Sequence, residues 1–339
     1  MQKRSLLYIG NKLSQKGIPV TSIETLGNFL EKEGFCVYKF SDKKNKLFRL
    51  VDMLWNTFVY ARKVTVVLID VYSTQNFYFA LAVANLCRLL KVPYIPILRG
   101  GNLPERLERS WAQSKKLFHG AKMNVAPSPY LLEAFQNKGF QNLTYIPNSI
   151  EIINYPFLKR KVYAPKLLWV RAFADIYNPI LALEVLEKLI ETHPGASLCM
   201  VGPDKDGSLQ KCKRFAEDNQ LPVTFTGKLS KEDWIDLSTD YDIFLNTTNF
   251  DNTPVSVIEA MALGLPVITT NVGGIPYLVQ NEKEAILVPP NDAHIFYQKI
   301  IAILETPEAI NEMTERARKK EERFDWQKVK ELWLALLKE

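Results

Sequence analysis

The feature that most constrains the fold of this chain is an alternation between short apolar runs and longer helical patterns, and this alternation occurs twice. The first half contains six runs that predict strands, at residues 5–10, 36–40, 64–70, 94–98, 123–128 and 143–148. The second half contains six more, at residues 166–172, 197–202, 223–227, 242–248, 265–270 and 285–290. Continuous apolar strands that alternate with helices indicate parallel sheets buried on both faces. We therefore expect an α/β protein with two doubly wound domains.

The segments between these runs set the expected domain boundaries. An irregular, basic segment at residues 149–165 separates the two sets. We expect an N-terminal domain at residues 1–150, a C-terminal domain at residues 151–323, and an amphipathic helix at 324–339 that packs back on the N-terminal domain. Because ligands bind at the carboxyl ends of strands in open α/β sheets, we expect the active site in the cleft between the domains. Other helices are expected at residues 21–34, 76–91, 128–139, 179–194 and 253–264.

Composition and residue spacing exclude several classes of protein. The longest nearly apolar run, residues 77–87, is too short to span a bilayer, and the first residues do not have the pattern of a signal peptide. The four cysteines form no Cys-x-x-Cys pair and the three histidines are scattered, so we expect reduced thiols and no zinc site. These features predict a cytoplasmic protein.

Charge is divided unequally between the two halves of the chain. Residues 1–150 contain 21 Lys and Arg against 9 Asp and Glu, a net charge of +12, whereas residues 151–339 have a net charge of −6. A basic first half favours an anionic partner, such as a lipid surface or a phosphate-bearing acceptor. Nucleic acid is not expected, because no helix-turn-helix, RNP or zinc-finger pattern accompanies the charge. Dispersed surface lysines without a partner are the alternative interpretation.

The most informative motif lies in FDNTPVSVIEAMALGLPVITTNVGG, residues 250–274. Asp251 and Glu259 are eight residues apart, and Glu259 lies in an otherwise apolar run. A carboxylate buried on a helix is costly unless a partner satisfies it, so we expect Glu259 to bind a ligand. Asp251 is expected in the loop that precedes the helix. The alternatives are an exposed helix face for Glu259 and a helix-capping loop acid for Asp251.

The start of this helix is a candidate anion site. Thr253 is predicted as the N-cap and Pro254 as the first helical residue. The next amides, those of Val255 and Ser256, are then free donors, and the helix macrodipole favours a bound anion there. The Gly273–Gly274 turn follows the next strand and is expected to bring another backbone segment close to the same anion.

Two turns in the first half are comparable candidates on the acceptor side. Gly10 follows the first strand, and Gly100 follows the strand at 94–98, with Arg99 immediately before it. A glycine at the end of a strand allows the backbone to approach a ligand closely. The alternative is that each glycine only forms the turn.

Together these motifs resemble those of the family 4 glycosyltransferases, which have the GT-B fold and are retaining, nucleotide-sugar-dependent enzymes. The resemblance rests on DNTPVSVIE followed by AMALGLPVITTNVGG, and the segments IPNSI, VRAF, VGPD and FDWQKV agree with it. It covers essentially the whole chain and is much stronger after residue 145. It implies two Rossmann-like domains that face each other across a cleft, the second of which binds the donor.

The resemblance also implies roles for individual residues. Glu259 would bind the ribose hydroxyls of the donor nucleotide, and Asp251 would contact the donor sugar. The backbone amides at the start of the helix, including that of Thr253, would bind the diphosphate, for which Arg171 is the matching arginine. The alternative for Arg171 is a salt bridge at the surface or at the domain join.

Four departures from the family pattern concern these contacts. The first acid is Asp251, where the family usually has Glu. The lysine that normally follows the arginine is missing, with Asn178 near its place, so the second positive charge is either absent or supplied by Lys228 or Arg99. The histidine of the first domain has no counterpart, because the matching strand end reads DVYSTQN. The acid that usually follows GGIP is replaced by Tyr277.

The implied reaction is transfer of a sugar, with retention, from a nucleoside diphosphate sugar to a glycan or a lipid-diphosphate-linked acceptor in bacterial cell-surface polysaccharide synthesis. We interpret the sequence as lacking an acidic metal motif of the D-x-D kind, so neither a metal ion nor another cofactor is expected. The basic first half would bring the protein to the inner face of an anionic membrane. Two alternatives are a non-catalytic nucleotide-sugar-binding subunit and another GT-B reaction, such as nucleotide-sugar epimerisation. A Rossmann dehydrogenase is disfavoured because no G-x-G-x-x-G follows the first strand.

Overall fold

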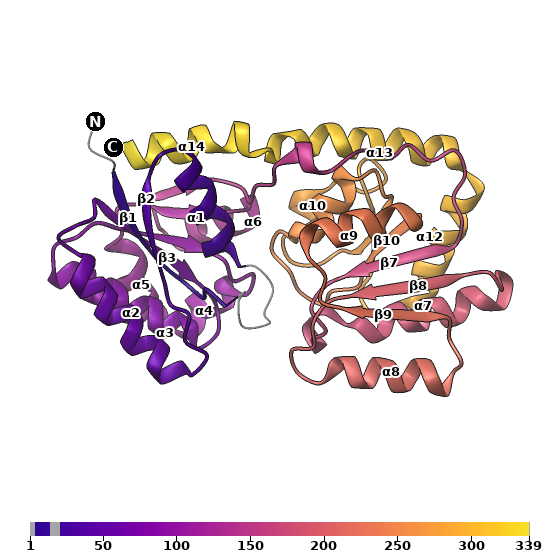
Figure 1. Ribbon diagram of the computed structural model, residues 1–339, viewed down its shortest axis with the longest axis horizontal. Coiled ribbons are helices and arrows are strands. Elements are labelled where there is room, and N and C mark those ends of the chain that lie inside the picture. Colours follow the sequence, from indigo (N-terminus) through magenta and orange to yellow (C-terminus); the bar gives the residue numbers. More distant parts are fainter. Residues whose placement is uncertain (1–3, 14–20, 339) are drawn as a thin grey trace. The chain divides into compact units, whose positions relative to one another are not determined.

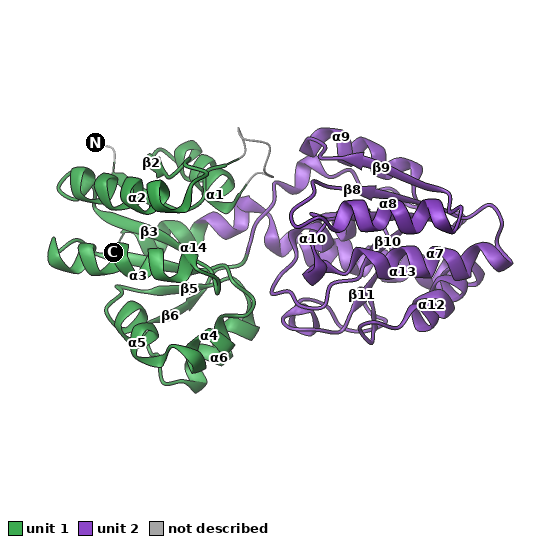
Figure 2. Cartoon of the chain, turned by 90° about the horizontal axis from the view of Figure 1, so that it is seen from below, with its two compact units in different colours: residues 1–147, 331–339 green, residues 148–330 purple. Residues whose placement is uncertain are grey.

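The computed structural model describes residues 4–13 and 21–338, which are divided between two compact units (Figure 2). Unit 1 comprises Met1–Pro147 together with Glu331–Glu339, and unit 2 comprises Asn148–Lys330. The first division of the chain thus falls close to the boundary that the sequence predicts after residue 150. The second falls inside the C-terminal helix.

Unit 1 contains a parallel sheet of six strands in the order β2-β1-β3-β4-β5-β6. Its three central strands, β1, β3 and β4, are almost entirely buried, as expected for parallel strands covered on both faces. The strands are β1 (Ser5–Ile9), β2 (Cys36–Phe40), β3 (Val66–Val71), β4 (Tyr94–Leu98), β5 (Asn124–Ala126) and β6 (Leu143–Tyr145).

Helices cover both faces of this sheet. On one face α3 packs against α2 and α5, and α1 covers the other face (Figure 1). The start of α6 illustrates the local cause of a helix boundary, because the Ser128 hydroxyl accepts a hydrogen bond from the Leu131 amide at 3.1 Å and Pro129 occupies the first turn. The helices are α1 (Ser22–Lys32), α2 (Lys46–Tyr60), α3 (Asn76–Leu89), α4 (Leu103–Arg109), α5 (Trp111–His119) and α6 (Pro129–Asn137).

Unit 2 contains a second parallel sheet of six strands, in the order β12-β11-β10-β7-β8-β9. Successive residues of β7 face two different cores: Leu167 and Trp169 pack with α7, α8 and α12, whereas Leu168 packs with α9 and α10. This alternation follows from the two-residue period of a strand. The strands are β7 (Lys166–Val170), β8 (Ser197–Val201), β9 (Val223–Gly227), β10 (Ile243–Asn246), β11 (Val267–Thr270) and β12 (Ile286–Val288).

The helices of unit 2 complete a doubly wound arrangement. They are α7 (Pro179–Thr192), α8 (Ser208–Asp218), α9 (Lys231–Leu237), α10 (Val255–Ala262), α11 (Ile275–Leu278), α12 (Ala293–Glu305), α13 (Pro307–Glu321) and α14 (Trp326–Lys338). Short 3₁₀ helices lie at η2 (Ile152–Asn154), η3 (Asp175–Tyr177), η4 (Ser238–Asp240) and η5 (Glu322–Phe324). Two parallel sheets, each covered by helices, confirm the expected α/β class.

The α14 helix belongs to both units. It begins in unit 2, and from Glu331 onward its residues are part of unit 1. In unit 1 its buried side chains include Trp333 and Leu336, and the Leu337 carbonyl accepts a hydrogen bond from Arg4 Nη1 at 3.1 Å. No helix in the described part of the chain is long and apolar enough to cross a membrane.

The observed strands lie within the predicted runs, except that β3 extends one residue further, and most are shorter than predicted. The runs predicted at 143–148 and 285–290 end early, at Tyr145 and Val288. Both predictions extended into prolines, which cannot donate to a strand ladder. The predicted helices are all present, with ends shifted by a few residues, whereas α2 was not among the helices that the sequence analysis named.

Candidate functional site

Three loops of unit 2 that carry predicted site residues leave the carboxyl ends of neighbouring strands. Arg171 follows β7, Asp251 follows β10, and Gly273 follows β11. These strands are neighbours in the sheet. The chain runs from β7 to β8 and β9 toward one edge of the sheet, and from β10 to β11 and β12 toward the other edge. The carboxyl ends of β7 and β10 therefore form a topological switch point, which is where open α/β sheets bind ligands.

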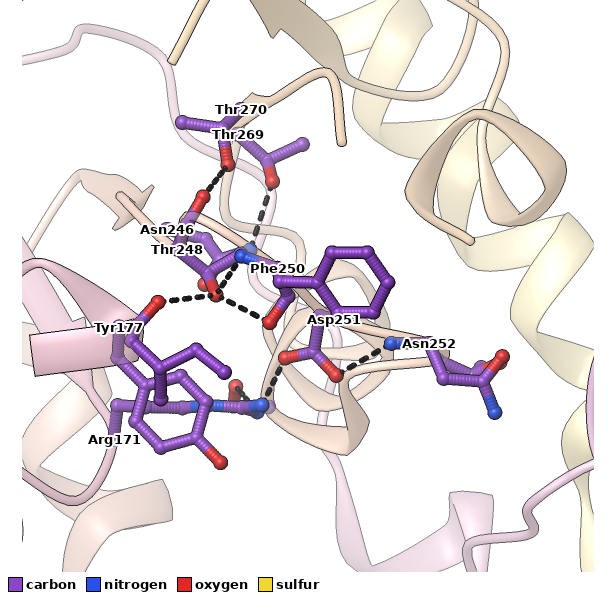
Figure 3. A network of polar contacts seen from close by, with 12 residues as sticks. Arg171, Tyr177, Asn246, Thr248, Phe250, Asp251, Asn252, Thr269 and Thr270 are labelled. Carbon is purple, nitrogen blue, oxygen red and sulfur yellow. Dashed lines mark hydrogen bonds and ion pairs between the residues drawn. The ribbon is translucent and has the colours of Figure 1, made fainter. Parts of the chain in front are cut away.

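Threonine hydroxyls fix the loop between β10 and α10 (Figure 3). The Thr248 hydroxyl is 2.9 Å from the Phe250 carbonyl, to which it donates, and it accepts from the Phe250 amide at 3.3 Å. The Thr270 hydroxyl donates to the Thr248 carbonyl at 2.5 Å, and the Thr247 hydroxyl donates to the Tyr177 carbonyl at 2.9 Å. The loop is thereby attached to the segments that follow both neighbouring strands.

Arg171 and Asp251, which the sequence analysis assigned to the diphosphate and the sugar, form an ion pair with each other (Figure 3). The Arg171 guanidinium also lies over the Tyr177 ring, 4.3 Å from its centroid, and its Nη1 donates to Ser256 Oγ at 3.4 Å. The second Asp251 oxygen, Oδ1, accepts from the Asn252 amide at 2.8 Å. A ligand at this pair would share or exchange these contacts.

The surroundings of Arg171 favour its charged form. Burial alone would lower the pKa of the guanidinium, but Asp251 and Tyr177 together raise that pKa above its ordinary value. The planar guanidinium has several donors, so it can contact a carboxylate and a phosphate at the same time. Its contact with Ser256 places it at the start of α10, beside the helix amides.

Helix α10 begins one residue later than predicted. Its N-cap is Pro254, whose φ of −67° and ψ of 114° are extended. The prediction of Thr253 as the N-cap was therefore wrong, because helical dihedral angles start only at Val255. The amides of Val255 and Ser256 lie in the first turn, where no helical carbonyl precedes them by four residues, so they are donors suited to an anion.

The Thr253 hydroxyl is a second polar group at this helix start. It is buried and has no hydrogen-bond partner among the residues that the structure describes. The Thr253 carbonyl accepts a hydrogen bond from the Asn148 side chain at 3.3 Å. Because an unpaired buried hydroxyl is destabilising, Thr253 is suited to contact a ligand with its side chain as well as its backbone.

The Gly273–Gly274 turn packs directly against the loop that carries Asp251. The Gly274 amide donates to the Asp251 carbonyl at 2.9 Å. A Cβ atom on Gly274 would come within 2.2 Å of the Asn252 carbonyl oxygen, and one on Gly273, whose φ is +55°, within 2.1 Å of the Asp251 carbonyl oxygen. Only glycine allows this approach. A direct contact between the turn and an anion stays a prediction.

Glu259 is buried on α10, with 3% of its surface exposed. Its Oε1 accepts a hydrogen bond from the Tyr155 hydroxyl at 2.7 Å and another from the Lys231 ammonium. No described residue donates to Oε2. One oxygen of the carboxylate is thus satisfied within the chain, and the other is available to a ligand hydroxyl.

The sequence analysis missed both partners of Glu259. Burial, together with the Glu259 carboxylate, raises the pKa of Tyr155 well above its ordinary value, so its hydroxyl stays protonated and donates. Lys231 is the first residue of α9, three positions after the predicted Lys228, whose exposed side chain lies in the turn after β9. No motif marks these residues, because separate parts of the chain bring them to α10.

A further missed residue, Lys205, lies near Arg171. Its ammonium is 5.8 Å from the centroid of the Tyr177 ring that Arg171 also contacts. Asn178, at the place expected for a lysine, instead is the N-cap of α7, and its side chain donates to Asn291 at 2.8 Å. Lys205 follows β8, the neighbour of β7 in the sheet, and it is a candidate for the second positive charge.

Of the predicted acceptor-side residues of unit 1, Arg99 forms a buried ion pair and Gly10 packs beside it. Arg99 Nε is 3.0 Å from Asp70 Oδ1, which also accepts from the Tyr8 hydroxyl at 2.9 Å. A Cβ atom on Gly10 would come within 2.7 Å of Asp70 Oδ2, and one on Gly100 within 2.5 Å of a backbone nitrogen. Both glycines thus have a packing role, and Arg99 is paired with Asp70. Ligand contacts for these three residues stay predictions.

The structure also bears on metal binding. The D-x-D spacing occurs twice, at Asp204 and Asp206 and at Asp240 and Asp242, so the interpretation that the sequence lacks it was wrong. In the first pair both carboxylates accept hydrogen bonds from amides at the start of α8: Gly207 donates to Asp204 at 3.0 Å and Ser208 to Asp206 at 3.2 Å. In the second pair Asp242 is 3.0 Å from Arg160 Nε. Among the described residues, no group of three or more His, Cys, Asp or Glu side chains could bind a metal ion.

Known proteins share a sequence pattern with the second half of this chain. Residues 157–320 match the family model for glycosyl transferases group 1. The chain is 25% identical over 203 residues to the glycogen synthase of Mycobacterium tuberculosis, a match that covers 56% of this chain and 47% of that protein. It is 40% identical over 91 residues to the putative colanic acid biosynthesis glycosyltransferase WcaL of Escherichia coli, covering 24% of this chain and 22% of that protein. The chain therefore spans about half the length, or less, of these relatives.

A solved structure supports the fold over the full chain. The crystal structure of Anabaena HepE in complex with UDP-glucose has a TM-score of 0.81 and 16% identity, with 98% of this chain and 99% of that chain covered. At this identity the likeness shows the fold alone. The expected resemblance to group 1 glycosyltransferases and the GT-B fold are thus confirmed, whereas assignment to family 4 in particular stays a prediction.

Proposed function

We propose that this chain, in which residues 157–320 have the glycosyl transferases group 1 pattern within a GT-B fold, is a retaining glycosyltransferase of family 4. It transfers a sugar from a nucleoside diphosphate sugar to a hydroxyl of a glycan or lipid-linked acceptor. UDP-glucose, the compound named with the HepE structure, is the first donor to test. The name of WcaL motivates a role in bacterial cell-surface polysaccharide synthesis.

The observation that carries this proposal concerns helix α10: within residues 4–13 and 21–338, Glu259 Oε2 has no donor and the amides of Val255 and Ser256 have no acceptor. Glu259 is four positions after Val255, which is about 6 Å along a helix. That spacing suits a nucleotide whose ribose hydroxyls donate to the carboxylate while its diphosphate accepts from the helix start. Buried polar groups need such partners.

The proposed chemistry follows from where negative charge develops. As the bond between the sugar and the diphosphate breaks, charge accumulates on the departing phosphate oxygens. The amides of Val255 and Ser256, the helix macrodipole and Arg171 stabilise that charge, and Lys205 adds a second cation nearby. No metal ion and no other cofactor take part in this proposal. Asp251 orients the donor sugar by accepting a hydrogen bond from one of its hydroxyls.

The acceptor side of the proposal rests on charge. Residues 1–150 have a net charge of +12, which favours a phosphate-bearing, lipid-linked acceptor at an anionic membrane. Lipid-diphosphate-linked glycans combine a negative charge with a free sugar hydroxyl. The protein would act at the inner face of the membrane as a peripheral enzyme.

A thermal-shift screen of nucleotides and nucleotide sugars tests donor binding, since a ligand that binds only the native state raises apparent stability by mass action. Product analysis with the donor that binds then distinguishes the reactions. Transfer to an added acceptor with the anomeric configuration retained is the expected result. Binding without turnover would instead indicate a non-catalytic subunit, and an altered free sugar nucleotide would indicate epimerisation.

A further inference from the structure

Helix α2 (Lys46–Tyr60) packs Met53, Leu54 and Tyr60 on the core of unit 1, but it also exposes large apolar side chains on its outer side, where an ordinary surface helix is polar. Four residues of the helix are buried, and three of them are polar: Arg49, Asn56 and Thr57, together with Met53. Five large apolar side chains, each 56% to 67% exposed, form what we call the apolar face: Leu47, Phe48, Val51, Trp55 and Phe58. Apolar exposure on this scale on one helix indicates an interaction surface.

The five side chains of the apolar face form one continuous stripe. At the helical rotation of about 100° per residue, all five project within an arc of roughly 100°. The rings of Trp55 and Phe58 are 6.4 Å apart between centroids, so they are in mutual contact. The helix packs beside α3 through its other side (Figure 1), which leaves this stripe to solvent.

Specific hydrogen bonds fix α2 in this orientation. The buried Arg49 guanidinium donates from Nε to the Lys43 carbonyl at 2.7 Å and from Nη1 to the Asn11 side chain at 3.1 Å. The buried Thr57 hydroxyl is satisfied within the helix itself, where it donates to the Met53 carbonyl at 2.7 Å, so Thr57 can face the interior. Rotating the helix to bury the apolar face would turn Arg49 out to solvent and break its bonds to the Lys43 carbonyl and Asn11. The outward apolar face is therefore built into the fold.

Basic residues flank the apolar face at both ends. Residues 41–63 contain six Lys and Arg and two Asp and Glu. The exposed cations are Lys43, Lys44 and Lys46 at the start of the helix, and Arg62 and Lys63 after its end. Aromatic and aliphatic side chains between cations are typical of helices that lie at the surface of an anionic bilayer. Lysine is depleted in protein–protein interfaces, so this composition favours a lipid partner.

We propose that α2 lies in the headgroup region of an anionic lipid bilayer, with the apolar face buried among the upper acyl chains and the flanking cations against the headgroups. The apolar face is the place where the proposed glycosyltransferase would contact the membrane, so its biological role rests on the proposed function. Binding itself requires no catalysis, so it is measured independently.

Sedimentation with vesicles tests the proposal. The wild-type chain is expected to bind vesicles of equal parts phosphatidylcholine and phosphatidylglycerol at low salt, and to bind pure phosphatidylcholine much more weakly. Replacing Trp55 and Phe58 together by serine is expected to lower the partition coefficient about tenfold or more. The matched control replaces Ile153 and Val162, which are 88% and 75% exposed in unit 2, by serine, and it is expected to bind as the wild type does.

Tryptophan fluorescence locates the inserted helix. Trp55 and Trp111 are 64% and 43% exposed, whereas the other four tryptophans are at most 4% exposed. We expect a blue shift with anionic vesicles that persists in Trp111→Phe and is lost in Trp55→Phe. Because phenylalanine also inserts, Trp55→Phe is expected to keep vesicle binding, which separates loss of the signal from loss of binding.

Three results would overturn the proposal: unchanged vesicle binding by the double serine variant, equal binding to neutral and anionic vesicles, or a wild-type dimer that this variant dissociates without any vesicle binding. The last result would assign the apolar face to a second copy of the chain. Nucleotide thermal shifts, measured on the same samples, distinguish the two ideas. Vesicle binding without any nucleotide shift would contradict the proposed function alone, and the converse would contradict the docking surface alone.

Discussion

Replacing Glu259 by glutamine tests the donor site most directly. The carboxylate is 3% exposed, and its Oε2 has no donor within the described residues. Glutamine keeps the volume and one acceptor oxygen for the Tyr155 hydroxyl, but it removes the charge and replaces the second acceptor with a donor. The Lys231 ammonium loses its partner, yet its side chain is 49% exposed and returns to water. The variant is therefore expected to fold and to bind nucleotide poorly.

The size of the effect follows from the hydrogen bonds lost. Each hydroxyl hydrogen bond to an ionised group contributes about 1.5–3 kcal/mol. With one acceptor retained, the expected loss is about 2–4 kcal/mol, which raises the dissociation constant roughly 30-fold to 1,000-fold. At a ligand concentration of about 100 times the wild-type dissociation constant, the wild type gains about 2.7 kcal/mol of stability. A 100-fold weaker variant gains only about 0.4 kcal/mol, so most of its thermal shift disappears.

Calorimetric titration with UDP and with 2′,3′-dideoxy-UDP provides the assay. We expect the wild type to discriminate strongly between the two ligands, and Glu259→Gln to bind both weakly and equally. The matched control is Glu284→Gln, because Glu284 pairs with Lys320 at 3.1 Å and both side chains are about 15% exposed. That control is expected to lose stability but not nucleotide affinity. Equal discrimination by the wild type and Glu259→Gln would refute the assignment.

Three other substitutions test separate parts of the argument. Arg171→Lys is expected to lower kcat about 100-fold in steady-state assays. Lysine keeps the positive charge but lacks the planar guanidinium, which can contact Asp251 and a phosphate at the same time. A kcat within about threefold of the wild type would contradict this role. Gly274→Ala is expected to lower Tm at a cost of about 1–3 kcal/mol, because its Cβ would come within 2.2 Å of a carbonyl oxygen, and scanning fluorimetry checks it against the wild type. Glu321 is fully buried, neither oxygen has a partner among the described residues, and burial raises its carboxyl pKa. Because the pKa of Glu321 is higher in the folded state than in the unfolded state, the free energy of unfolding is largest below the unfolded-state pKa and falls as the pH rises through the folded-state pKa. Glu321→Gln should therefore have a higher Tm than the wild type at pH 8 and the same Tm near pH 4. A difference in Tm that does not depend on pH would refute this.

The sequence was sufficient to predict the fold class because each strand is a short, nearly continuous apolar run. Where runs extended into proline, as at Pro147 and Pro289, the predicted ends were too late, since apolarity alone does not reveal the loss of an amide donor. The N-cap of α10 was missed by one residue for a similar reason. Both Thr253 and Pro254 suit the start of a helix, and only the dihedral angles distinguish them.

Candidate site residues on one motif could be predicted, whereas residues brought to it from elsewhere could not. Glu259 could be identified because a carboxylate in an apolar run is costly to bury without a partner. Asp251 could be identified because it precedes Glu259 at the spacing of the motif. Tyr155 and Lys231 lie in unremarkable local sequence, and Lys205 follows VGPD without being marked by it; only the folded chain brings the three residues near the site. The α2 helix was not named although its apolar residues recur at helical spacing; that spacing indicates a helix, but not that the apolar side faces solvent.

The shared helix α14 has a consequence for synthesis of the chain on the ribosome. Unit 1 is made of Met1–Pro147 and Glu331–Glu339, so the first unit to leave the exit tunnel is the last to be completed. Until residues 148–330 have been translated, the surface that receives Trp333 and Leu336 stays uncovered. Domains usually fold in the order in which they are made. Here unit 2 can finish first, and the nascent unit 1 exposes an apolar surface throughout that interval.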